Sequence, residues 1–483
     1  GMLVVGSDSH TATAGAFNTL AMGINKTETA VLWKTGKMWF RVPETVKIVL
    51  KNRLPEGVFA KDLALWIKGI LSKLDVNGLA IEYHGEGVAS LSIDDRMTIA
   101  NISTEMGVVS SAFPPDDRLA DYFNEPAVRG VWADEEAVYS RFIEIDLANV
   151  FPMVYDTGNN VLQGVEELVG LKIQQGLIGA CASGRLEDLR LVSMILEGKH
   201  IANGFQLFVV PASRDIYLRA VEEGIIDKIA QSGAMVLGSS CGPCLGVGRV
   251  ASVGNSRFIS TANSQYIGGT NHSGVEKYIA SPATVAMTAL RGELTPMIHF
   301  EGTQYKYNIP RVEPVVLGEY DYRKSNGVWN YGDIDNISSN QIFSEKLTCR
   351  LTLEQVEEIK PYLFKGLDPN FTCDVKPGDI IIAGENFGCG QLVKHAATGL
   401  VAVGVKLVIA KSVNRDFYRM AINHGLRILV DWAVVDAYTS GEQLTIDDEN
   451  HLLYLNERAY KLPYVDAEFQ KILEKGGLVN AFS

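Results

Sequence analysis

Three cysteines lie in two loops whose residue types could bind a metal cluster. Cys241 and Cys244 form a Cys-x-x-Cys pair flanked by glycines, which let backbone amides approach the sulfurs. Cys181 lies sixty positions upstream, directly after an apolar run typical of a strand. Three thiolates from two strand-end loops could hold three corners of a [4Fe–4S] cube and leave one iron open. An open iron can bind a substrate hydroxyl and carboxylate as a Lewis acid, without electron transfer.

The same cysteines have other readings. A lone Cys181 is often a buried structural thiol. Cys241-Gly-Pro-Cys244 also resembles a thioredoxin-like dithiol, although that motif normally follows an aromatic strand end early in a small domain. A zinc site needs a fourth ligand, and the nearest candidate, His272, has no matching spacing. The two cysteine motifs together favour the cluster.

The pattern of the remaining chain predicts α/β layers that position these loops. Short apolar runs typical of strands alternate with runs of helical spacing to about residue 295. The expected strands and helices of this part are residues 1–6, 46–50 and 79–83 as strands, and 12–24 and 59–74 as helices. The opening strand has no residues before it, so we expect an N-terminal segment to be missing or supplied by a second chain.

The composition changes between residues 301 and 330, where Pro, Tyr, Lys, Asn and Gly occur without periodicity. We therefore expect a cluster-binding region over 1–300, a linker over 301–330 and a second α/β domain over 331–483. In the last region two strand–helix–strand units follow one another. Their expected elements are strands at 379–383, 405–410 and 426–430, a helix after the loop 384–390, and a helix at 416–423.

Composition and charge exclude several functions for the 483-residue chain. Hydrophobic residues make up 47% and charged residues 21%, which is ordinary for a globular protein. The net charge of −13 opposes binding of a phosphate backbone, so we expect no nucleic-acid partner. No apolar run approaches the roughly 18 residues that cross a bilayer. Six cysteines without a secretion signal fit a reduced, cytoplasmic protein.

Five motifs in this order resemble the aconitase and 3-isopropylmalate dehydratase superfamily. The resemblance spans nearly the whole chain and implies a multi-domain aconitase-like α/β/α fold with a C-terminal swivelling domain in the same polypeptide. The family's large unit also has a segment before the first motif. In chain order the motifs are Gly6–Thr11, the Cys181 loop with Gly184–Asp188, Cys241–Cys244, Gly384–Gly390 and Lys411–Tyr418.

The resemblance implies a hydro-lyase that removes and re-adds water on a hydroxy carboxylic acid. Asp8 and His10 would act on the departing hydroxyl, Ser9 would touch the substrate, and Glu105 and Asn101 would face the site. Such roles are chemically reasonable, because an Asp can fix a His tautomer and a helix N-terminus favours anions. The plainer reading is that Asp8 and Ser9 cap a helix, and that Glu105 lies on a solvated helix face.

This sequence differs from the family at the positions that bind substrate carboxylates and abstract a proton. The family sequence Gly-Ser-Ser-Arg-Glu-His supplies a serine base and an arginine, but here Gln391, Leu392 and Val393 occupy these places. Lys394 and the nearby Cys389 are the remaining candidates for a base, although a loop lysine is normally solvated.

Other substrate-binding positions also differ. After the cysteine pair Asn263 is kept and both arginines are lost, and Tyr331 replaces a further arginine. Losing bidentate carboxylate clamps is not conservative. We expect Asn263, Gln391 and Lys394 to contact substrate together with Ser9 and Asn101.

The sequence therefore predicts an iron–sulfur hydro-lyase that activates the hydroxyl of a small, less charged hydroxy acid. The first alternative is a non-catalytic or regulatory relative that keeps the cluster. A thiol redox protein using Cys241 and Cys244 is a further alternative. RNA binding, known among aconitase relatives, is disfavoured by the net charge.

Overall fold

The computed structural model divides into two compact units. Unit 1 comprises Gly1–Asn25 and Val42–Arg311, and unit 2 comprises Lys26–Arg41 and Val312–Ser483. The chain therefore passes between the units three times, and an early segment belongs with the C-terminal part. The residues that the structure describes are 1–241, 244, 256–263, 275–300, 306–309, 315, 317, 322–343, 356–390, 393–463 and 466–482.

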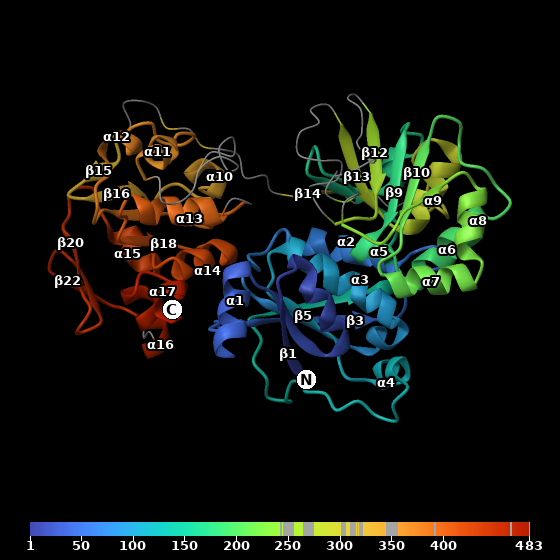
Figure 1. Cartoon of the computed structure of the whole chain (residues 1–483), viewed down its shortest axis with the longest axis horizontal. Coiled ribbons are helices and arrows are strands. Elements are labelled where there is room, and N and C mark those ends of the chain that lie inside the picture. The colour runs from blue at the N-terminus through green and yellow to red at the C-terminus, as the bar shows by residue number, and fades with distance from the viewer. Residues whose placement is uncertain are drawn as a thin grey trace. The chain divides into compact units, whose positions relative to one another are not determined.

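Unit 1 is built around two larger sheets and one strand pair (Figure 1). The first larger sheet has the order β5-β4-β3-β6 and is parallel throughout. The second has the order β11-β10-β9-β12-β13-β7-β8-β14 and is parallel from β11 to β13. Its other pairs are antiparallel. Strands β1 and β2 form the separate parallel pair.

The described elements of unit 1 follow the expected α/β alternation. Its strands are β1 (Met2–Gly6), β2 (Thr19–Gly23), β3 (Thr45–Lys51), β4 (Ala80–His84), β5 (Ser110–Ala112), β6 (Arg141–Asp146), β7 (Met153–Asp156), β8 (Val161–Gly164), β9 (Gln175–Gly179), β10 (Gln206–Val210), β11 (Met235–Val236), β12 (Arg257–Ser260), β13 (Glu276–Ala280) and β14 (Lys306–Asn308). Its α-helices are α2 (Ala60–Leu71), α3 (Ile93–Ser103), α4 (Asp117–Phe123), α5 (Ala180–Ser183), α6 (Leu186–Leu196), α7 (Arg214–Glu222), α8 (Ile225–Gln231) and α9 (Pro282–Arg291). Short 3-10 helices are η1 (Ser9–Phe17), η2 (Glu86–Ser90), η3 (Thr104–Met106), η4 (Leu147–Asn149) and η5 (Val165–Leu168).

Periodicity identified the main elements of unit 1 correctly. The expected strands at 46–50 and 79–83 are β3 and β4, and the expected helix at 59–74 is α2. In β3, Val46, Ile48 and Leu50 alternate into the core and are fully buried. Helix α2 begins with a carboxylate cap, because the Phe59 amide donates to Asp62 Oδ2 at 3.0 Å.

The expected helix over 12–24 was wrong, because it is a 3-10 helix followed by a strand. Asn18 adopts a left-handed conformation with φ 57° and ends η1 after Phe17. Its side-chain amide donates to Phe113 O and Val131 O, each at 3.0 Å, which fixes the reversal. The next residues then pair with β1 as β2. Tertiary partners of one asparagine therefore overrode the helical composition.

Unit 2 contains a mixed sheet with the order β15-β16-β17-β18-β19, which is parallel from β16 to β19, and an antiparallel β20-β21-β22 sheet. The predicted strand–helix–strand units are confirmed as β17, α13, β18, α14 and β19. Its strands are β15 (Lys324–Ser325), β16 (Val328–Tyr331), β17 (Ile380–Ala383), β18 (Leu407–Ala410), β19 (Arg427–Val430), β20 (Leu444–Asp447), β21 (Leu452–Leu455) and β22 (Arg458–Lys461). Its helices are α1 (Lys26–Thr35), α10 (Ser339–Ile342), α11 (Val356–Ile359), η7 (Lys360–Tyr362), α12 (Phe371–Asp374), α13 (Val393–Ala402), α14 (Arg415–Asn423), α15 (Trp432–Ala437), α16 (Ala467–Glu474) and α17 (Leu478–Phe482).

The segment 26–41, which we call the strap, is held to unit 2 by buried polar contacts. Glu28 in α1 is 2% exposed and forms an ion pair with Arg419 of α14. Asn423 Nδ2 also donates to Glu28 Oε1 at 2.5 Å, and Trp39 Nε1 donates to Asn423 Oδ1 at 3.0 Å. The Arg419 guanidinium lies 4.8 Å from the centroid of the Trp39 ring. These contacts join residues nearly 400 positions apart in the chain.

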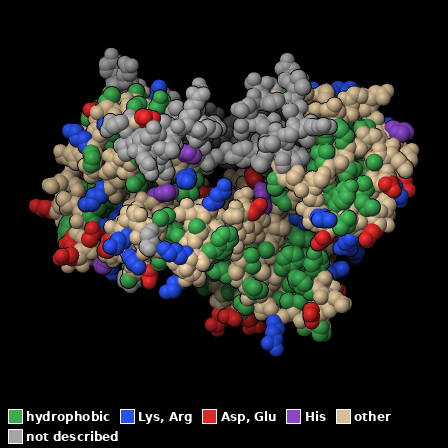
Figure 2. Space-filling model, in the orientation of Figure 1, with side chains coloured by type: hydrophobic (Ala, Val, Ile, Leu, Met, Phe, Trp, Pro, Cys, Tyr) green, Lys and Arg blue, Asp and Glu red, His purple; other side chains and the backbone are tan. Residues whose placement is uncertain are grey.

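The visible surface carries both signs of charge. On the face that Figure 2 shows, Lys and Arg side chains are interspersed with Asp and Glu side chains among the described residues. None of the helices in the described ranges has the length and apolar character needed to span a membrane.

Candidate functional site

Cys181 is presented by a tight turn at the end of a parallel strand. Strand β9 ends at Gly179, whose φ is 124°, and Ala180 follows with φ 55°. A Cβ at Gly179 would lie 1.9 Å from the carbonyl oxygen of Val210, so only glycine fits there. Arg185 then fastens the turn, because its Nη2 donates to Cys181 O at 2.7 Å. This geometry puts the thiol at the carboxyl end of the strands, where α/β sheets bind ligands.

His10 and Glu105 face the Cys181 thiol. His10 Nε2 lies 3.7 Å from Glu105 Oε1, which is too long for a direct hydrogen bond. The same nitrogen is buried and has no hydrogen-bond partner among the described residues. Burial lowers the pKa of His10, but the adjacent Cys181 thiolate and Glu105 carboxylate outweigh it and raise the pKa to about 10. His10 thus favours the protonated form, and its Nε2 lies next to Cys181 and Glu105 without an acceptor at hydrogen-bond distance among the described residues.

Asp8 and Ser9 are engaged with the start of η1. Asp8 Oδ1 accepts a hydrogen bond from the His10 amide at 2.7 Å, as a helix-capping carboxylate does. The Ser9 carbonyl accepts from Thr104 Oγ1 at 3.2 Å, which ties η1 to the end of α3. Asp8 therefore caps the helix, as the simpler of the two interpretations predicted.

A series of buried side-chain hydrogen bonds holds the asparagines of the site in place. Lys61 Nζ donates to Asn263 Oδ1, and Asn263 Nδ2 donates to Asn101 Oδ1. Asn101 Nδ2 donates to Thr13 Oγ1 at 2.8 Å, and the Asn101 side chain also neighbours the Cys181 thiol. Burial, with a smaller contribution from Lys68, lowers the pKa of Lys61 to about 7. The two predicted asparagines are thus held in fixed amide orientations.

The three predicted cysteine ligands lie near one another. Burial and the neighbouring thiols Cys181 and Cys241 raise the pKa of Cys244 to about 12, and burial and Cys181 also raise that of Cys241. For Cys181, burial opposes ionisation, but His10, Asn101 and Arg185 lower its pKa overall.

This donor set suits a cluster better than a single ion. No three His, Cys, Asp or Glu side chains within the described ranges converge closely enough to hold one metal ion. Thiolates that bind separate corners of an iron–sulfur cube need not converge in this way. The mutual repulsion that raises two of the thiol pKa values is also what bound cations relieve. The residues present therefore fit a cubane cluster with three protein thiolates.

The same pKa values oppose a dithiol redox site. A catalytic Cys-x-x-Cys motif lowers the pKa of one of its own cysteines. Here both Cys241 and Cys244 have raised pKa values, and the cysteine with a lowered pKa is Cys181 in the other loop.

The predicted residues of the C-terminal loop belong to unit 2. Lys394 is exposed at the start of α13, as expected for a solvated lysine. The Cys389 thiol is buried and donates to Asn336 O at 3.5 Å, and burial raises its pKa to about 11. Tyr331 is a core residue of β16 whose hydroxyl donates to Asp368 Oδ2 at 2.8 Å. Gln391 lies outside the described residues, as do Leu392 and His272.

Sequence reasoning missed three residues of the site. Lys61 carried no signal, because a lysine in an amphipathic helix is usually taken as solvated. Thr13 lay within a stretch read as an ordinary helix. Arg185 was visible only as part of the motif that follows Cys181, and its backbone hydrogen bonds could not be read from the sequence.

Comparison with known proteins identifies the family of both parts of the chain. Residues 1–165 and 157–292 match the model of the aconitase family (aconitate hydratase). Residues 328–430 match the aconitase C-terminal domain.

Individual relatives agree with these matches. A 3-isopropylmalate dehydratase large subunit from Methanopyrus kandleri is 39% identical over 300 residues, covering 61% of this chain and 72% of that protein. A mitochondrial homoaconitase from Debaryomyces hansenii is 29% identical over 540 residues, covering 99% of this chain and 78% of that protein. Among solved structures, a 3-isopropylmalate dehydratase (leuD) from Methanocaldococcus jannaschii is 34% identical and covers 30% of this chain and 86% of its own, with a TM-score of 0.28.

A second solved structure, the holo-form of aconitase X from Thermococcus kodakaraensis, is 13% identical and covers 46% of this chain and 49% of its own, with a TM-score of 0.29. The family matches confirm the predicted aconitase-like α/β fold and the predicted class of enzyme, because dehydratases and homoaconitases are hydro-lyases. This chain belongs to the aconitase family of hydro-lyases.

Proposed function

We propose that the chain binds a [4Fe–4S] cluster through Cys181, Cys241 and Cys244 and acts on a hydroxy carboxylic acid. One observation supports this proposal above all: the Cys181 thiol lies next to the side chains of His10, Glu105 and Asn101 at one strand end. When bound, the cluster would supply an open iron that polarises the substrate hydroxyl. The name of one relative supports 3-isopropylmalate, a dicarboxylic hydroxy acid, as the first acid to test.

The residues of the chain then have distinct roles. The buried His10 Nε2 has no acceptor at hydrogen-bond distance among the described residues, so its proton is available to a departing hydroxyl. Glu105, 3.7 Å away, stabilises the charged imidazole. When water adds back, the neutral imidazole of His10 accepts the proton that the water loses. Asp8 holds the backbone of His10 in place. Asn101 orients its amide toward Cys181 and is fixed there by Asn263.

The charges available in unit 1 support a substrate with few carboxylates. Lys61 is engaged with Asn263, and Arg185 donates to Thr98 and to the carbonyls of Cys181 and Ala182. Neither cation is left to form a bidentate clamp on a substrate carboxylate. We infer a less charged acid than a tricarboxylate, with Ser9 and, from unit 2, Gln391 and Lys394 as its further contacts.

One observation favours a non-catalytic relative as the second candidate. The family's proton-abstracting serine is absent, and neither substitute in unit 2 is a ready base. Lys394 is exposed, and the Cys389 thiol has a raised pKa. A base of ordinary strength contributes about 10²–10⁴-fold to a rate, so its loss could leave a cluster protein without turnover.

Replacing Cys181 by Ser is expected to abolish the normal cluster content of the protein. Iron and acid-labile sulfide are measured on wild type and variant purified without oxygen. We expect about four irons and four sulfides per wild-type chain, and a large loss in Cys181→Ser. Iron content depends on the ligands alone, so this measurement tests cluster binding separately from activity.

Cys373→Ser is the matched control, because Cys373 is an exposed cysteine of unit 2 that belongs to neither cysteine loop of the proposed cluster site. It should keep the iron content of the wild type. Equal iron in all three proteins, or none in the wild type, would contradict the cluster. A loaded wild type that turns over no acid of a panel of mono-, di- and tricarboxylic hydroxy acids would favour the non-catalytic reading.

The exposed β1 strand supports a further polypeptide next to unit 1. Among the described strands β1 pairs only with β2, and Met2 and Leu3 at its start are 69% and 48% exposed. A cavity of about 420 Å³ lies beside these residues. We propose that an extended segment, from a second chain or from additional polypeptide, packs here.

A further inference from the structure

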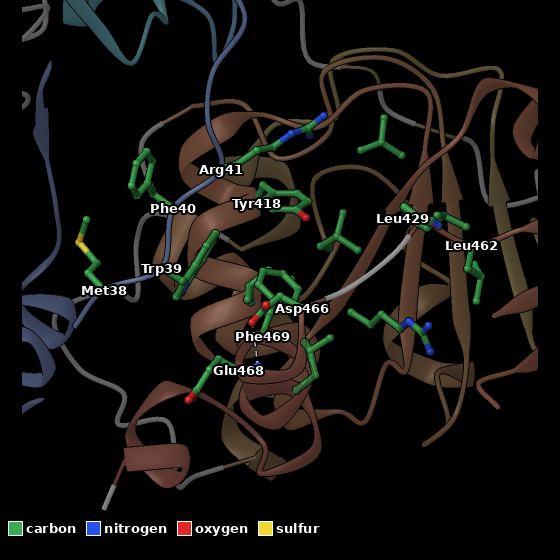
Figure 3. Close-up of a pocket in the computed structure, with 16 residues that line it drawn as sticks. Met38, Trp39, Phe40, Arg41, Tyr418, Leu429, Leu462, Asp466, Glu468 and Phe469 are labelled. Atoms are coloured by element: carbon green, nitrogen blue, oxygen red, sulfur yellow. Dashed lines mark hydrogen bonds between the residues drawn. The ribbon is translucent and has the colours of Figure 1, made fainter. Parts of the chain in front are cut away.

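Unit 2 contains a cavity that the proposed reaction does not use. Its volume is about 650 Å³, within the usual range for small-molecule sites. One side is formed by residues 38–41 of the strap and the rest by residues of α14, β19 and α16 together with Leu462, Pro463 and Asp466 (Figure 3). Its lining is mainly apolar and aromatic, and includes Trp39, Tyr418, Ile428, Leu429, Leu462 and Phe469. An apolar body of moderate size would therefore be well accommodated.

Two hydrogen-bond donors line this cavity without a partner among the described residues: the exposed guanidinium of Arg41 and the hydroxyl of the half-buried Tyr418. Figure 3 labels both residues, Arg41 in the strap and Tyr418 in α14. Within the described ranges, no carboxylate pairs with the Arg41 guanidinium and no residue accepts from the Tyr418 hydroxyl. Burial raises the pKa of Tyr418, although the positive charge of Arg41 acts in the opposite direction, so the phenol stays a donor. A guanidinium and a phenol together match the acceptor geometry of a carboxylate.

Of the other charged groups in the described lining, Arg427 and Asp466 have polar partners, and Glu468 faces solvent. Arg427 forms an ion pair with Asp448. Asp466 caps α16 by accepting from the Glu468 amide at 2.9 Å, which places its charge at a helix N-terminus. Glu468 is exposed. Among the described lining residues, Arg41 is thus the cation without a carboxylate partner.

We propose that this cavity binds a small monocarboxylic acid with an apolar branched or aromatic body. The carboxylate pairs with Arg41 and Tyr418, and the apolar body lies against Trp39, Phe469 and Leu429. None of the residues that line this cavity is among those assigned to the cluster or to the proposed reaction, and all of them belong to unit 2.

Ligand binding here would also hold the strap. Residues 38–41 supply one side of the cavity, and the chain leaves unit 2 for unit 1 directly after Arg41. A ligand that contacts both the strap and α14 favours the state in which the two are packed together. The bound acid therefore stabilises one of the chain connections between the units.

The test uses the full chain and 3-phenylpropionate as the probe, with binding measured by calorimetry. We expect a Kd of about 1 mM or lower. Arg41→Met should weaken binding about tenfold or more, since a hydrogen bond to a charged group contributes about 1.5–3 kcal/mol, and Arg41→Lys should recover part of it. Hydrogen exchange of residues 38–41 should slow on binding in the wild type.

Arg458→Met is the matched control, because Arg458 is an exposed arginine of unit 2 that does not line the cavity. It should bind the probe as the wild type does. Uncharged 3-phenylpropionamide should bind much more weakly than the acid. Equal binding of acid and amide, unchanged affinity in Arg41→Met, or no binding at about 10 mM acid would each overturn the proposal.

Discussion

Replacing Arg419 by Met is expected to destabilise unit 2 by about 3–5 kcal/mol, because it leaves the Glu28 carboxylate buried without its cation. Glu28 is 2% exposed, and the side chain of Arg419 is 12% exposed, so water cannot replace the lost partner. The substitution also removes the hydrogen bond from Arg419 Nη2 to Trp39 O and the stacking on the Trp39 ring. Hydrogen exchange in α1 and α14 measures the effect locally, without assuming two-state unfolding of a two-unit chain.

A double variant separates the cost of an unpaired charge from the loss of packing. Glu28→Met combined with Arg419→Met replaces both charges by apolar groups, and such replacements are often close to neutral. We therefore expect the double variant to be more stable than Arg419→Met alone, whereas Arg458→Met should match the wild type. Faster exchange in the double variant than in the single one would contradict this account of the strap.

The sequence predicted the helices and strands whose own residue pattern shows which face is buried. Strand β3 alternates buried and half-buried positions along its whole length, and the parallel strands β17 and β18 are continuous apolar runs. These patterns reflect which faces are covered, so a single sequence contains them. The glycine-rich loop between β17 and α13 and the turn before Cys181 were also visible, since close backbone approach requires glycine.

What the sequence could not show depends on contacts between distant residues. The helical composition of residues 12–24 gave no warning that Asn18 would bind the carbonyls of Phe113 and Val131 and end the helix. The strap reads as part of the N-terminal region, yet its buried Glu28 is satisfied by Arg419 and Asn423. A charged residue in an amphipathic helix is expected to be solvated unless a distant partner is known.

The residues of the candidate site also fall into two groups, those that sequence motifs indicate and those that only distant contacts reveal. The cysteines, His10, Glu105 and the two asparagines were found through motifs, and their motifs bring them to one strand end in unit 1. Lys61 was missed because its role follows only from the hydrogen bond to Asn263, about 200 positions away. Lys61 donates to the amide oxygen of Asn263, so the amide nitrogen of Asn263 must point toward Asn101. The direction of these hydrogen bonds depends on contacts between distant residues, so no local sequence pattern predicts it.

Replacing His10 by Asn is expected to lower the dehydration rate by about 10²–10⁴-fold, because it removes the proton donor from the departing hydroxyl. The rate is measured on the hydroxy acid that the wild type converts fastest. His10 is not among the three thiolate ligands, so the iron and sulfide content should remain that of the wild type. Asn keeps the backbone amide that donates to Asp8 Oδ1 at 2.7 Å, and the start of η1 should therefore be preserved.

His200→Asn is the control for this substitution, because His200 is exposed in unit 1. It should retain both rate and iron. A His10→Asn variant that loses iron together with activity would mean that His10 acts by holding Cys181 in place and not by donating a proton. An unchanged rate with full iron would remove His10 from the mechanism and leave Glu105 as the group next to the thiol that handles the proton.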